Sequence, residues 1–430
     1  MRIIQTLILF MLVSTAYGQN VLTIEEAVNT ALKNNFDIRV ARNNAEIAKI
    51  NNTPGNAGML PTIGVTGAGS YENDNVHQKY SVGEDKKYPA LSTTSFSAGT
   101  ELAWTLFDGG KMFVTRNKLR QIEALGEIQF KEQVLQTQYD VIAAYYDVVR
   151  QKQQLKSYNE AINFNRERVK IAQTGFDAGS LLKTDLLQAK IDLNVATENA
   201  INQQYVIEAG KKNLNRLLGR NPETTFEIAD VIPLDYSPDK ADLLRKLNSS
   251  NTAILSLQKQ VEIAEWTLRE NKKSNLPVLN LNAGYYLSQT DNSDGTILSN
   301  RSIGPQVGGK VSIPLYTAGE NKRKISEAKL QLQSAEYNLE NIKLQVSTDL
   351  ENTLTEFENQ QRLVQIESEN SSLTKENFEI SIQRLRLGQT NSLEVHQAQE
   401  DYIQSCSRFI NFKYNLKMAE TKLQQLISTL

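Results

Sequence analysis

The chain has 430 residues and carries 47 lysines and arginines against 49 aspartates and glutamates, a formal net charge of -2. This near balance gives no electrostatic attraction for a polyanion, so nucleic-acid binding is excluded as a principal function. The mean hydropathy of -0.43 describes a water-facing chain, and beyond the N-terminus no stretch reaches the ~18 consecutive apolar residues that a membrane-spanning helix needs. The single cysteine, Cys406, allows no internal disulfide, so stability has to come from packing or assembly.

The first residues have the order of a secretory signal. Arg2 precedes an apolar run over residues 7–13, and Ala16-Tyr17-Gly18, with a small residue at each end, precedes Gln19. This is the order of charge, apolar core and cleavage site in an export signal. We therefore expect residues 1–18 to be a signal peptide. No cysteine follows that site, so we expect no N-terminal lipid anchor.

The remainder of the chain contains two copies of one plan. Leu60-Pro61 recurs as Leu276-Pro277. Further on, residues 106–110 recur as residues 315–319 at a slightly shorter shift. The first copy must therefore carry a longer insertion between these anchors, around residues 71–93. Self-similarity of this kind indicates internal duplication, and insertions concentrate in exposed loops.

Each copy predicts the same order of elements: a helix, an alternating strand pair, a very long helix, a tight turn and a return helix. We assign residues 19–220 to a first structural repeat, 221–240 to a connecting periplasmic segment and 241–430 to a second structural repeat. The elements expected after the opening helix of each repeat are hairpin 62–107, long helix 111–174, return helix 181–218, hairpin 278–315, long helix 320–385 and return helix 392–427.

The long segments have the pattern of coiled-coil helices. Apolar residues between Ile325 and Val346 follow alternating three- and four-residue steps, which mark a coiled-coil seam. Each long helix would span roughly 95 Å at about 1.5 Å per residue. Gly179 and Gly388 supply the glycine that commonly ends a helix, so the sequence predicts two long helical hairpins.

The segments between the helices alternate in the manner of strands. Apolar residues from Phe96 to Leu106 and from Leu279 to Leu287 fall on one face of a period-two strand. The strands reach the ~9 to 11 residues of a tilted transmembrane strand. Four strands cannot close a barrel, and open edges in lipid leave backbone groups unpaired at several kcal/mol each. We therefore expect three copies to share one closed barrel.

Several short motifs follow one another along the chain: Leu22-Thr23-Ile24-Glu25-Glu26-Ala27, Ala31-Leu32-Lys33-Asn34-Asn35, Leu60-Pro61, Leu106-Phe107-Asp108-Gly109-Gly110 and Leu217-Leu218-Gly219. With the repeat and the signal, their order resembles the TolC-like outer-membrane efflux protein family over essentially the whole mature chain. The resemblance implies a mainly α fold with a β-barrel portion. Internally duplicated, long coiled-coil helical hairpins would form a periplasmic α-barrel, and four strands per chain would join a trimeric 12-stranded outer-membrane β-barrel.

The resemblance also implies a function and partners. An outer-membrane channel subunit of a tripartite efflux or type I secretion system is a passive exit duct. Its substrates come from an inner-membrane pump of the RND, ABC or MFS type through a periplasmic adaptor (membrane fusion) protein. The chain would be a homotrimer in contact with outer-membrane lipid, with a large periplasmic portion. The alternative function is a periplasmic coiled-coil adaptor or scaffold, which would need no paired strand hairpins.

By the same resemblance, a gate lies just after the turn of each helical hairpin. Glu394 falls on the family's first acidic gate position, and Gln397 on the second. Asp185 is the matching first-copy carboxylate, with Thr184 beside it. Three copies of Asp185 and Glu394 on inward-facing helices would form carboxylate rings that attract cations. The alternative is that both are solvated acids in a first helical turn, where they favour the helix dipole.

The turns themselves match the family's adaptor-contact motifs. They are Ala178-Gly179-Ser180 and Leu387-Gly388-Gln389, and each is also a glycine turn that ends a helix. Arg384 and Arg386 stand beside the second turn. We expect them either to dock acidic groups of the adaptor or to bind the last carbonyls of their own helix.

The sequence gives no basis for catalysis. It contains two histidines, His77 and His396, one cysteine, and no phosphate-cradling glycine loop or nucleophile constellation. We therefore expect no enzyme activity, no metal site and no cofactor. For His396, which stands close to Glu394, packing is favoured over titration. The lack of methionine and histidine clusters argues against a dedicated copper or silver route.

Overall fold

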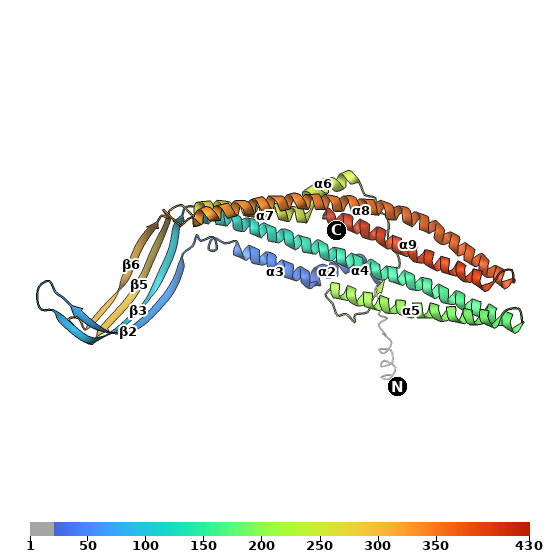
Figure 1. Ribbon diagram of the computed structural model, residues 1–430, viewed down its shortest axis with the longest axis horizontal. Helices are drawn as coiled ribbons and strands as arrows, with labels where there is room; N and C mark the ends of the chain where they lie inside the picture. The colour runs from blue at the N-terminus through green and yellow to red at the C-terminus, as the bar shows by residue number, and fades with distance from the viewer. Residues whose placement is uncertain (1–20) are drawn as a thin grey trace, which may run out of the picture. The chain divides into compact units, whose positions relative to one another are not determined.

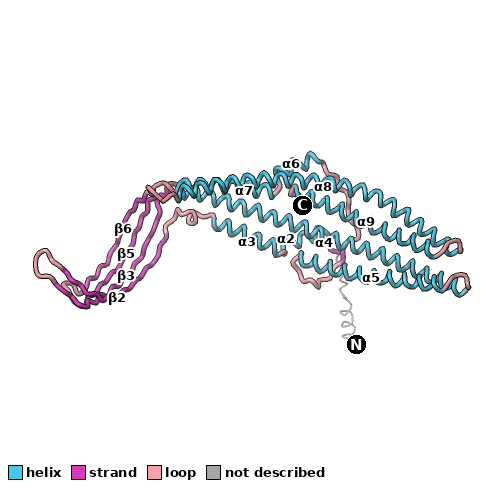
Figure 2. The backbone as a smooth tube through the Cα atoms, in the orientation of Figure 1, coloured by secondary structure: helices cyan, strands magenta, loops and turns pink. Residues whose placement is uncertain are grey.

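The computed structural model describes residues 21–430 (Figures 1 and 2). The predicted signal peptide and Gln19 lie outside the described residues. The chain divides into two compact units, each built from segments of both halves of the sequence. The helical unit comprises the residues up to Asn43, Gln129–Leu255 and Asn341–Leu430, and the sheet unit comprises Asn44–Ile128 and Ser256–Glu340.

Long helices dominate the described residues. The longest, α4 and α8, each have 67 residues, and each is followed by a return helix of 35 residues. In the helical unit α5 turns back along α4, and α9 turns back along α8 (Figure 1). The helices are α2 (Ile24–Asn34), α3 (Phe36–Asn51), α4 (Lys111–Asp177), α5 (Lys183–Leu217), α6 (Lys240–Ser250), α7 (Thr252–Lys273), α8 (Glu320–Arg386) and α9 (Ser392–Leu426).

Both long helices end at a glycine turn. The helix α4 continues to Asp177 and α8 to Arg386, slightly beyond the predicted ends at 174 and 385. Gly179 and Gly388 then adopt positive φ angles of 74° and 68°. Glycine reaches this conformation without the steric cost of a Cβ, which explains why the direction of the chain reverses at these two positions.

The sheet unit contains one antiparallel sheet of four strands in the order β2-β3-β5-β6 (Figure 2). The strands are β2 (Thr62–Gln78), β3 (Lys86–Asp108), β5 (Val278–Asn292) and β6 (Ser299–Ser312). The two hairpins meet where β3 pairs with β5, so β2 and β6 are the outer strands. The β5–β6 pair ends at Ser312, short of the predicted 315. Pro314, which follows closely, has no N–H to donate.

The first hairpin of the sheet is longer than the second. The strand β3 pairs with β5 only from Thr93 onward, whereas β2 and β3 stay paired as far as Gln78 and Lys86. Residues 73–91 therefore form a two-stranded ribbon without a third strand. This ribbon holds His77, whose Nε2 lies 3.6 Å from Oδ2 of Asp85 in the connecting loop.

The two faces of the sheet differ in polarity. Successive side chains on a strand point to opposite faces, so the pairing register assigns each residue to one of them. One face carries the rows Ile63, Leu102, Ala283, Val307 and Gly67, Ala98, Leu287, Ile303. The other carries the rows Ala68, Ser97, Ser288, Ser302 and Ser70, Ser95, Thr290, Asn300. The sheet thus has one apolar face and one face of small and polar residues.

The core of the helical unit forms around α4. Val141, Val148 and Val149 of α4 are fully buried, and they belong to the same cluster as Leu214 of α5. The hydroxyl of Tyr145, also on α4, donates a hydrogen bond to the carbonyl of Leu22 over 3.0 Å. Leu22 lies on the short strand β1 (Val21–Leu22), which pairs in parallel with β4 (Glu227–Ile228).

A buried asparagine joins helix ends once in each half of the chain. Asn35 donates from Nδ2 to the carbonyl of Leu217 at the end of α5 over 2.8 Å, while its Oδ1 accepts from backbone N–H groups at the start of α3. Asn251 donates in the same way to the carbonyl of Leu426 over 2.8 Å, and its Oδ1 accepts from the N–H of Ile254. Each side chain therefore satisfies backbone groups that helix ends leave without partners.

We expect Asn35→Ala to lower the melting temperature of the purified protein. The substitution removes a helix cap worth about 0.5–2 kcal/mol and leaves the buried carbonyl of Leu217 without its donor, at about 1–3 kcal/mol. Thermal unfolding followed by circular dichroism measures the effect. Asn43→Ala, an exposed change on the same helix, is the control and should leave the melting temperature nearly unchanged. Equal losses in the two variants would contradict the role of Asn35.

Candidate functional site

One turn connects the two helices of each hairpin, and the two turns are closely similar. In the first turn the backbone N–H of Ser180 donates to the carbonyl of Gly175 over 2.8 Å, and in the second the N–H of Gln389 donates to that of Arg384 over 2.8 Å. These bonds have the pattern of a glycine-ended helix. All six predicted turn residues are exposed: Ala178, Gly179, Ser180, Leu387, Gly388 and Gln389.

Asp185 lies in the first turn of α5 and caps the helix. Its Oδ2 accepts a hydrogen bond from the backbone N–H of Leu182 over 3.1 Å. Thr184 beside it is exposed. A carboxylate in this position also interacts favourably with the helix dipole. In the single chain, the contacts of Asp185 are therefore those of the helix-capping alternative.

Glu394 is held within its own hairpin. Its Oε1 accepts from Nη1 of Arg384 over 2.6 Å, and its Oε2 accepts from the hydroxyl of Thr390. The N–H of Glu394 donates to Oδ1 of Asn391 over 2.9 Å, which caps α9. Arg384 also donates to the carbonyl of Gln389 over 3.3 Å. The carboxylate and the guanidinium are each 44 % exposed, so their attraction is worth at most about 1 kcal/mol, but it compensates much of the charge of Glu394.

Gln397 of the predicted gate and Arg386 of the predicted adaptor contact also have partners within the chain. Gln397 donates from Nε2 to Oδ1 of Asp401, one turn further along α9, over 2.9 Å. Arg386 donates from Nη2 to Oε1 of Glu167 on α4 over 3.2 Å. The second of these contacts joins the turn of the second hairpin to the long helix of the first.

A buried arginine that the sequence analysis did not single out lies between α4, α5 and α9. Arg168 is 2 % exposed, and its Nη1 lies 3.0 Å from Oδ2 of Asp192 on α5. The same nitrogen donates to Oδ1 of Asn165 and to Oε1 of Gln399, each over 3.1 Å. Burial lowers the pKa of Arg168 from its ordinary value, and Asp192 acts in the opposite sense. Because arginine is so strongly basic, the guanidinium remains charged.

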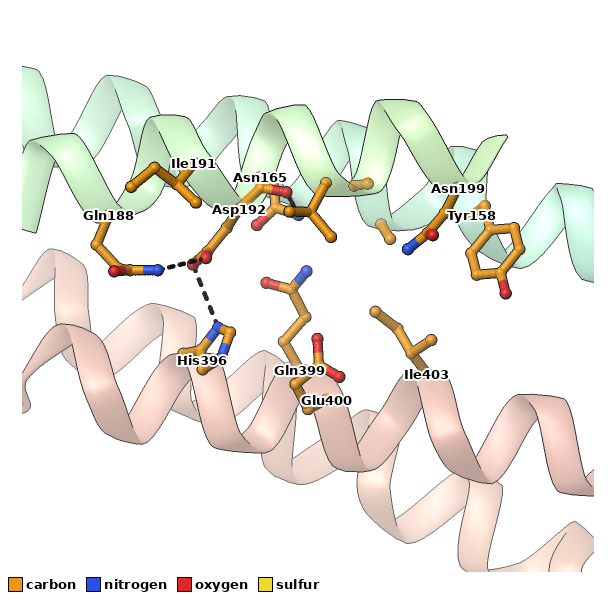
Figure 3. A pocket seen from close by; sticks show the side chains of 13 residues that line it. Tyr158, Asn165, Gln188, Ile191, Asp192, Asn199, His396, Gln399, Glu400 and Ile403 are labelled. Carbon is orange, nitrogen blue, oxygen red and sulfur yellow. Dashed lines mark hydrogen bonds and ion pairs between the residues drawn. The ribbon is translucent and has the colours of Figure 1, made fainter. Parts of the chain in front are cut away.

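His396 completes this cluster from α9. Its Nδ1 lies 3.2 Å from Oδ2 of Asp192, and Gln188 donates from Nε2 to Oδ1 of the same carboxylate over 2.8 Å. Figure 3 shows Asp192 between these two side chains. The Asp192 side chain is 9 % exposed and that of His396 is 37 % exposed. The sequence analysis favoured a packing role for His396 and gave no indication of this acidic partner.

A cavity of about 540 Å³ adjoins the cluster. Its walls come from α4, α5 and α9, and they include Tyr158, Asn199, Glu400 and Ile403 as well as His396 (Figure 3). The cavity is therefore lined by both polar and apolar side chains. The imidazole of His396 lies at the cavity wall, where solvent can reach it.

The sequence contains a pattern that could have indicated the burial of Arg168. Ala161, Asn165, Arg168 and Ala172 follow four- and three-residue steps, the spacing of a coiled-coil seam, and all four are buried. A charge on a seam position needs a partner, so this pattern could have marked Arg168. No sequence rule pairs it with Asp192, which stands on another helix.

Over residues 21–430, every helix falls short of the length and apolar character needed to cross a membrane. In the same residues, no group of three or more histidine, cysteine, aspartate and glutamate side chains is arranged to hold a metal ion. The thiol of Cys406 is free.

Comparison with known proteins identifies the relatives of this architecture. The model of the outer membrane efflux protein family matches residues 27–220 and 243–429. Outer membrane efflux protein BepC of Brucella suis is 23% identical over 89% of this chain and 80% of its own length. Alkaline protease secretion protein AprF of Pseudomonas aeruginosa is 24% identical over 84% of this chain and 73% of its own. The structure of outer membrane protein VceC from Vibrio cholerae superimposes with a TM-score of 0.76 at 15% identity, covering 94% of this chain and 96% of that one.

The chain belongs to the outer membrane efflux protein family. The predicted fold class is confirmed for its helical hairpins, its strand portion and its internal duplication. The predicted outer-membrane location and channel function are confirmed as well, and the relatives give no support to the adaptor or scaffold alternative. Members of this family are channel proteins and not enzymes.

We expect Arg168→Leu to destabilise the protein by about 3–5 kcal/mol, because it leaves the buried carboxylate of Asp192 without its guanidinium partner. The double variant Arg168→Leu/Asp192→Leu removes both buried charges and should recover much of the loss. Chemical unfolding followed by circular dichroism measures both. Arg166→Leu, an exposed change on the same helix, is the control. A double variant less stable than Arg168→Leu would argue against the pair.

Proposed function

We propose that three copies of this chain form a passive exit duct across the outer membrane. Each copy would contribute β2, β3, β5 and β6 to a twelve-stranded barrel and its two helical hairpins to a periplasmic barrel of helices. The chain itself would catalyse nothing. An inner-membrane pump of the RND, ABC or MFS type would supply the transport energy and deliver substrates through a periplasmic adaptor. The names of BepC and AprF favour efflux or protein secretion as the task.

The observation that carries the proposal is a sheet with one apolar face and two unpaired edges. Among the described strands, β2 bonds only to β3 and β6 only to β5. On the apolar face, Val65 is 81% exposed and Val307 is 73% exposed. Lipid would cover such a face, but in lipid an unpaired strand edge costs several kcal/mol per backbone group. Pairing β6 of one copy with β2 of the next removes both edges when the copies close into a ring.

Exposed apolar stripes on the helices support the same assembly. On α8, Ile366, Leu373 and Ile380 recur at the seven-residue spacing of a coiled coil and are 56%, 56% and 49% exposed. On α5, Leu187 and Ile191 are 48% and 53% exposed. A stripe with this spacing is a seam for another helix. We assign these stripes to contacts between neighbouring copies.

We propose that the first turns of α5 and α9 narrow the duct. Asp185 and Thr184 from the first hairpin, and Glu394 and Gln397 from the second, would face the lumen there. Three copies of each carboxylate would attract cations. Because Arg384 binds Glu394 in the single chain, the Glu394 ring would carry less negative potential than three bare carboxylates. Arg384 would therefore set how much charge this part of the gate presents.

The exposed turns are the proposed docking points for the adaptor. Their backbone is fixed by hydrogen bonds of the chain itself, so they present a preformed shape. Arg384 and Arg386 are already paired with Glu394 and Glu167. An acidic group of the adaptor would have to compete with these partners. The proposed contact residues are Ala178, Gly179, Ser180, Leu387, Gly388, Gln389, Arg384 and Arg386.

We expect the detergent-solubilised protein to have the mass of a trimer in light scattering. Val307→Arg places a charge on the apolar face of β6, which costs about 2–4 kcal/mol near the bilayer midplane, and should sharply reduce the trimer recovered from outer membranes. Gln306→Arg, the neighbouring residue on the opposite face, is the control and should assemble. A monodisperse monomer from the unchanged chain, or equal recovery of both variants, would overturn the proposal.

We expect Glu394→Ala to lower the cation selectivity of reconstituted channels and Arg384→Ala to raise it. The first change removes a carboxylate from the lumen, and the second uncovers one. Reversal potentials in asymmetric salt measure the selectivity. Glu223→Ala, which removes an exposed acid after α5, is the control. Unchanged reversal potentials in both test variants would remove Glu394 from the gate.

A further inference from the structure

One buried cluster joins the first helical hairpin to the second. Asp192 on α5 lies 3.0 Å from Nη1 of Arg168 on α4 and 3.2 Å from Nδ1 of His396 on α9. Arg168 also donates to Gln399 on α9 over 3.1 Å. A single carboxylate, 9 % exposed, therefore connects three helices drawn from both halves of the chain.

The internal duplication does not account for this cluster. In the alignment of the two copies, residues 186–189 match residues 395–398, so Leu187 stands where the second copy has His396. Asp401, the counterpart of Asp192, is exposed. The cluster is therefore a feature of one contact between the hairpins and not a repeated part of the scaffold.

The charged and titratable groups around His396 come from four helices. They are Arg168 and Tyr158 of α4, Asp192 of α5, Glu400 of α9 and, near the start of α9, Arg384 of α8 in its pair with Glu394. While the imidazole is neutral, one guanidinium faces the two carboxylates Asp192 and Glu400. A proton on His396 removes this excess of negative charge.

We propose that protonation of His396 strengthens the contact that this cluster makes between the two hairpins, an inference that rests on the proposed duct. We call this contact the tie. Imidazole is the side chain that ordinarily changes charge between about pH 5 and pH 8. His396 is 37 % exposed at the wall of a cavity of about 540 Å³, so protons can reach it (Figure 3). Once protonated, its Nδ1, which lies 3.2 Å from Oδ2 of Asp192, becomes the cationic partner of a carboxylate that is only 9 % exposed, where solvent screens the attraction little.

Acid favours the tied arrangement. A proton that binds more tightly when α5 and α9 are together shifts the population toward that state as the pH falls. As the pH rises the tie weakens, but it is not lost, because Arg168 still contacts Asp192 on α5 and Gln399 on α9. Since the first turns of α5 and α9 are proposed to narrow the duct, the duct closes more often in acid.

The first test compares single-channel records of the full-length protein in planar bilayers at about pH 5.5 and about pH 8, on either side of histidine titration. We expect the ratio of closed to open time to be at least about fivefold higher in acid, a typical coupling between two sites. His396→Gln can still hydrogen-bond to Asp192 but cannot become charged, so it should lose most of this pH dependence. His77→Gln, at the other histidine of the chain, is the matched control and should retain it.

The second test measures the tie directly. Spin labels at the exposed positions Lys190 on α5 and Leu393 on α9, in a Cys406→Ser background and in trimers diluted with unlabelled chains, report the separation of the hairpins by pulsed electron paramagnetic resonance. We expect a shorter and narrower distance distribution in acid than in alkali. His396→Gln should show no such change.

The outcomes separate this inference from the proposed function. If no channels form at any pH, the proposed function fails, while the label distances still support or overturn the tie. If channels form and His396→Gln keeps the pH dependence of the unchanged protein, the tie is overturned. Label distances that do not respond to pH, or loss of the response in His77→Gln alone, would overturn it as well.

Discussion

Backbone groups on a strand in lipid need partners within protein, because the bilayer core offers none. The sheet of this chain has four strands, too few to close on themselves, and in the proposed duct the outer edges of β2 and β6 would pair with those of neighbouring copies. Its apolar face, with Val65 and Val307, and its opposite face of serine, threonine and glycine suit a wall between lipid and water. The exposed apolar stripes on α5 and α8 are consistent with the same proposed assembly, because a coiled-coil seam that is open in one copy could pack against a helix of the next.

The sequence predicts the elements well because the signals that define them are local. Period-two strands, three- and four-residue steps in helices, and the left-handed turns at Gly179 and Gly388 are all readable from neighbouring residues. The partner of Glu394 was not predictable in the same way, because whether Arg384 reaches it depends on the geometry of the turn between them. Arg168 was missed because the seam that the sequence analysis followed lies in α8, whereas Arg168 lies on α4 and its carboxylate partner comes from α5.

The two halves of the chain share their helix junctions but not their buried charges. Asn35 and Asn251 make matching bonds at corresponding junctions, because each half leaves the same backbone groups without partners there. The contacts of Asp192 with Arg168 and with His396 occur only in this one place among the described residues. A duplicated scaffold can thus repeat its helix junctions while a buried contact among α4, α5 and α9 is present only once.

The ribbon over residues 73–91 extends past the last residues at which β3 pairs with β5. A two-stranded hairpin is only marginally stable in water without a third strand or a packed face. It carries exposed charged side chains such as Asp74 and Lys87. At the outer mouth of a closed duct, three such ribbons would be the part of the protein that antibodies and proteases meet first. A cut or a change of sequence in this segment would leave the pairing of β3 with β5 in place, because β5 does not pair along it.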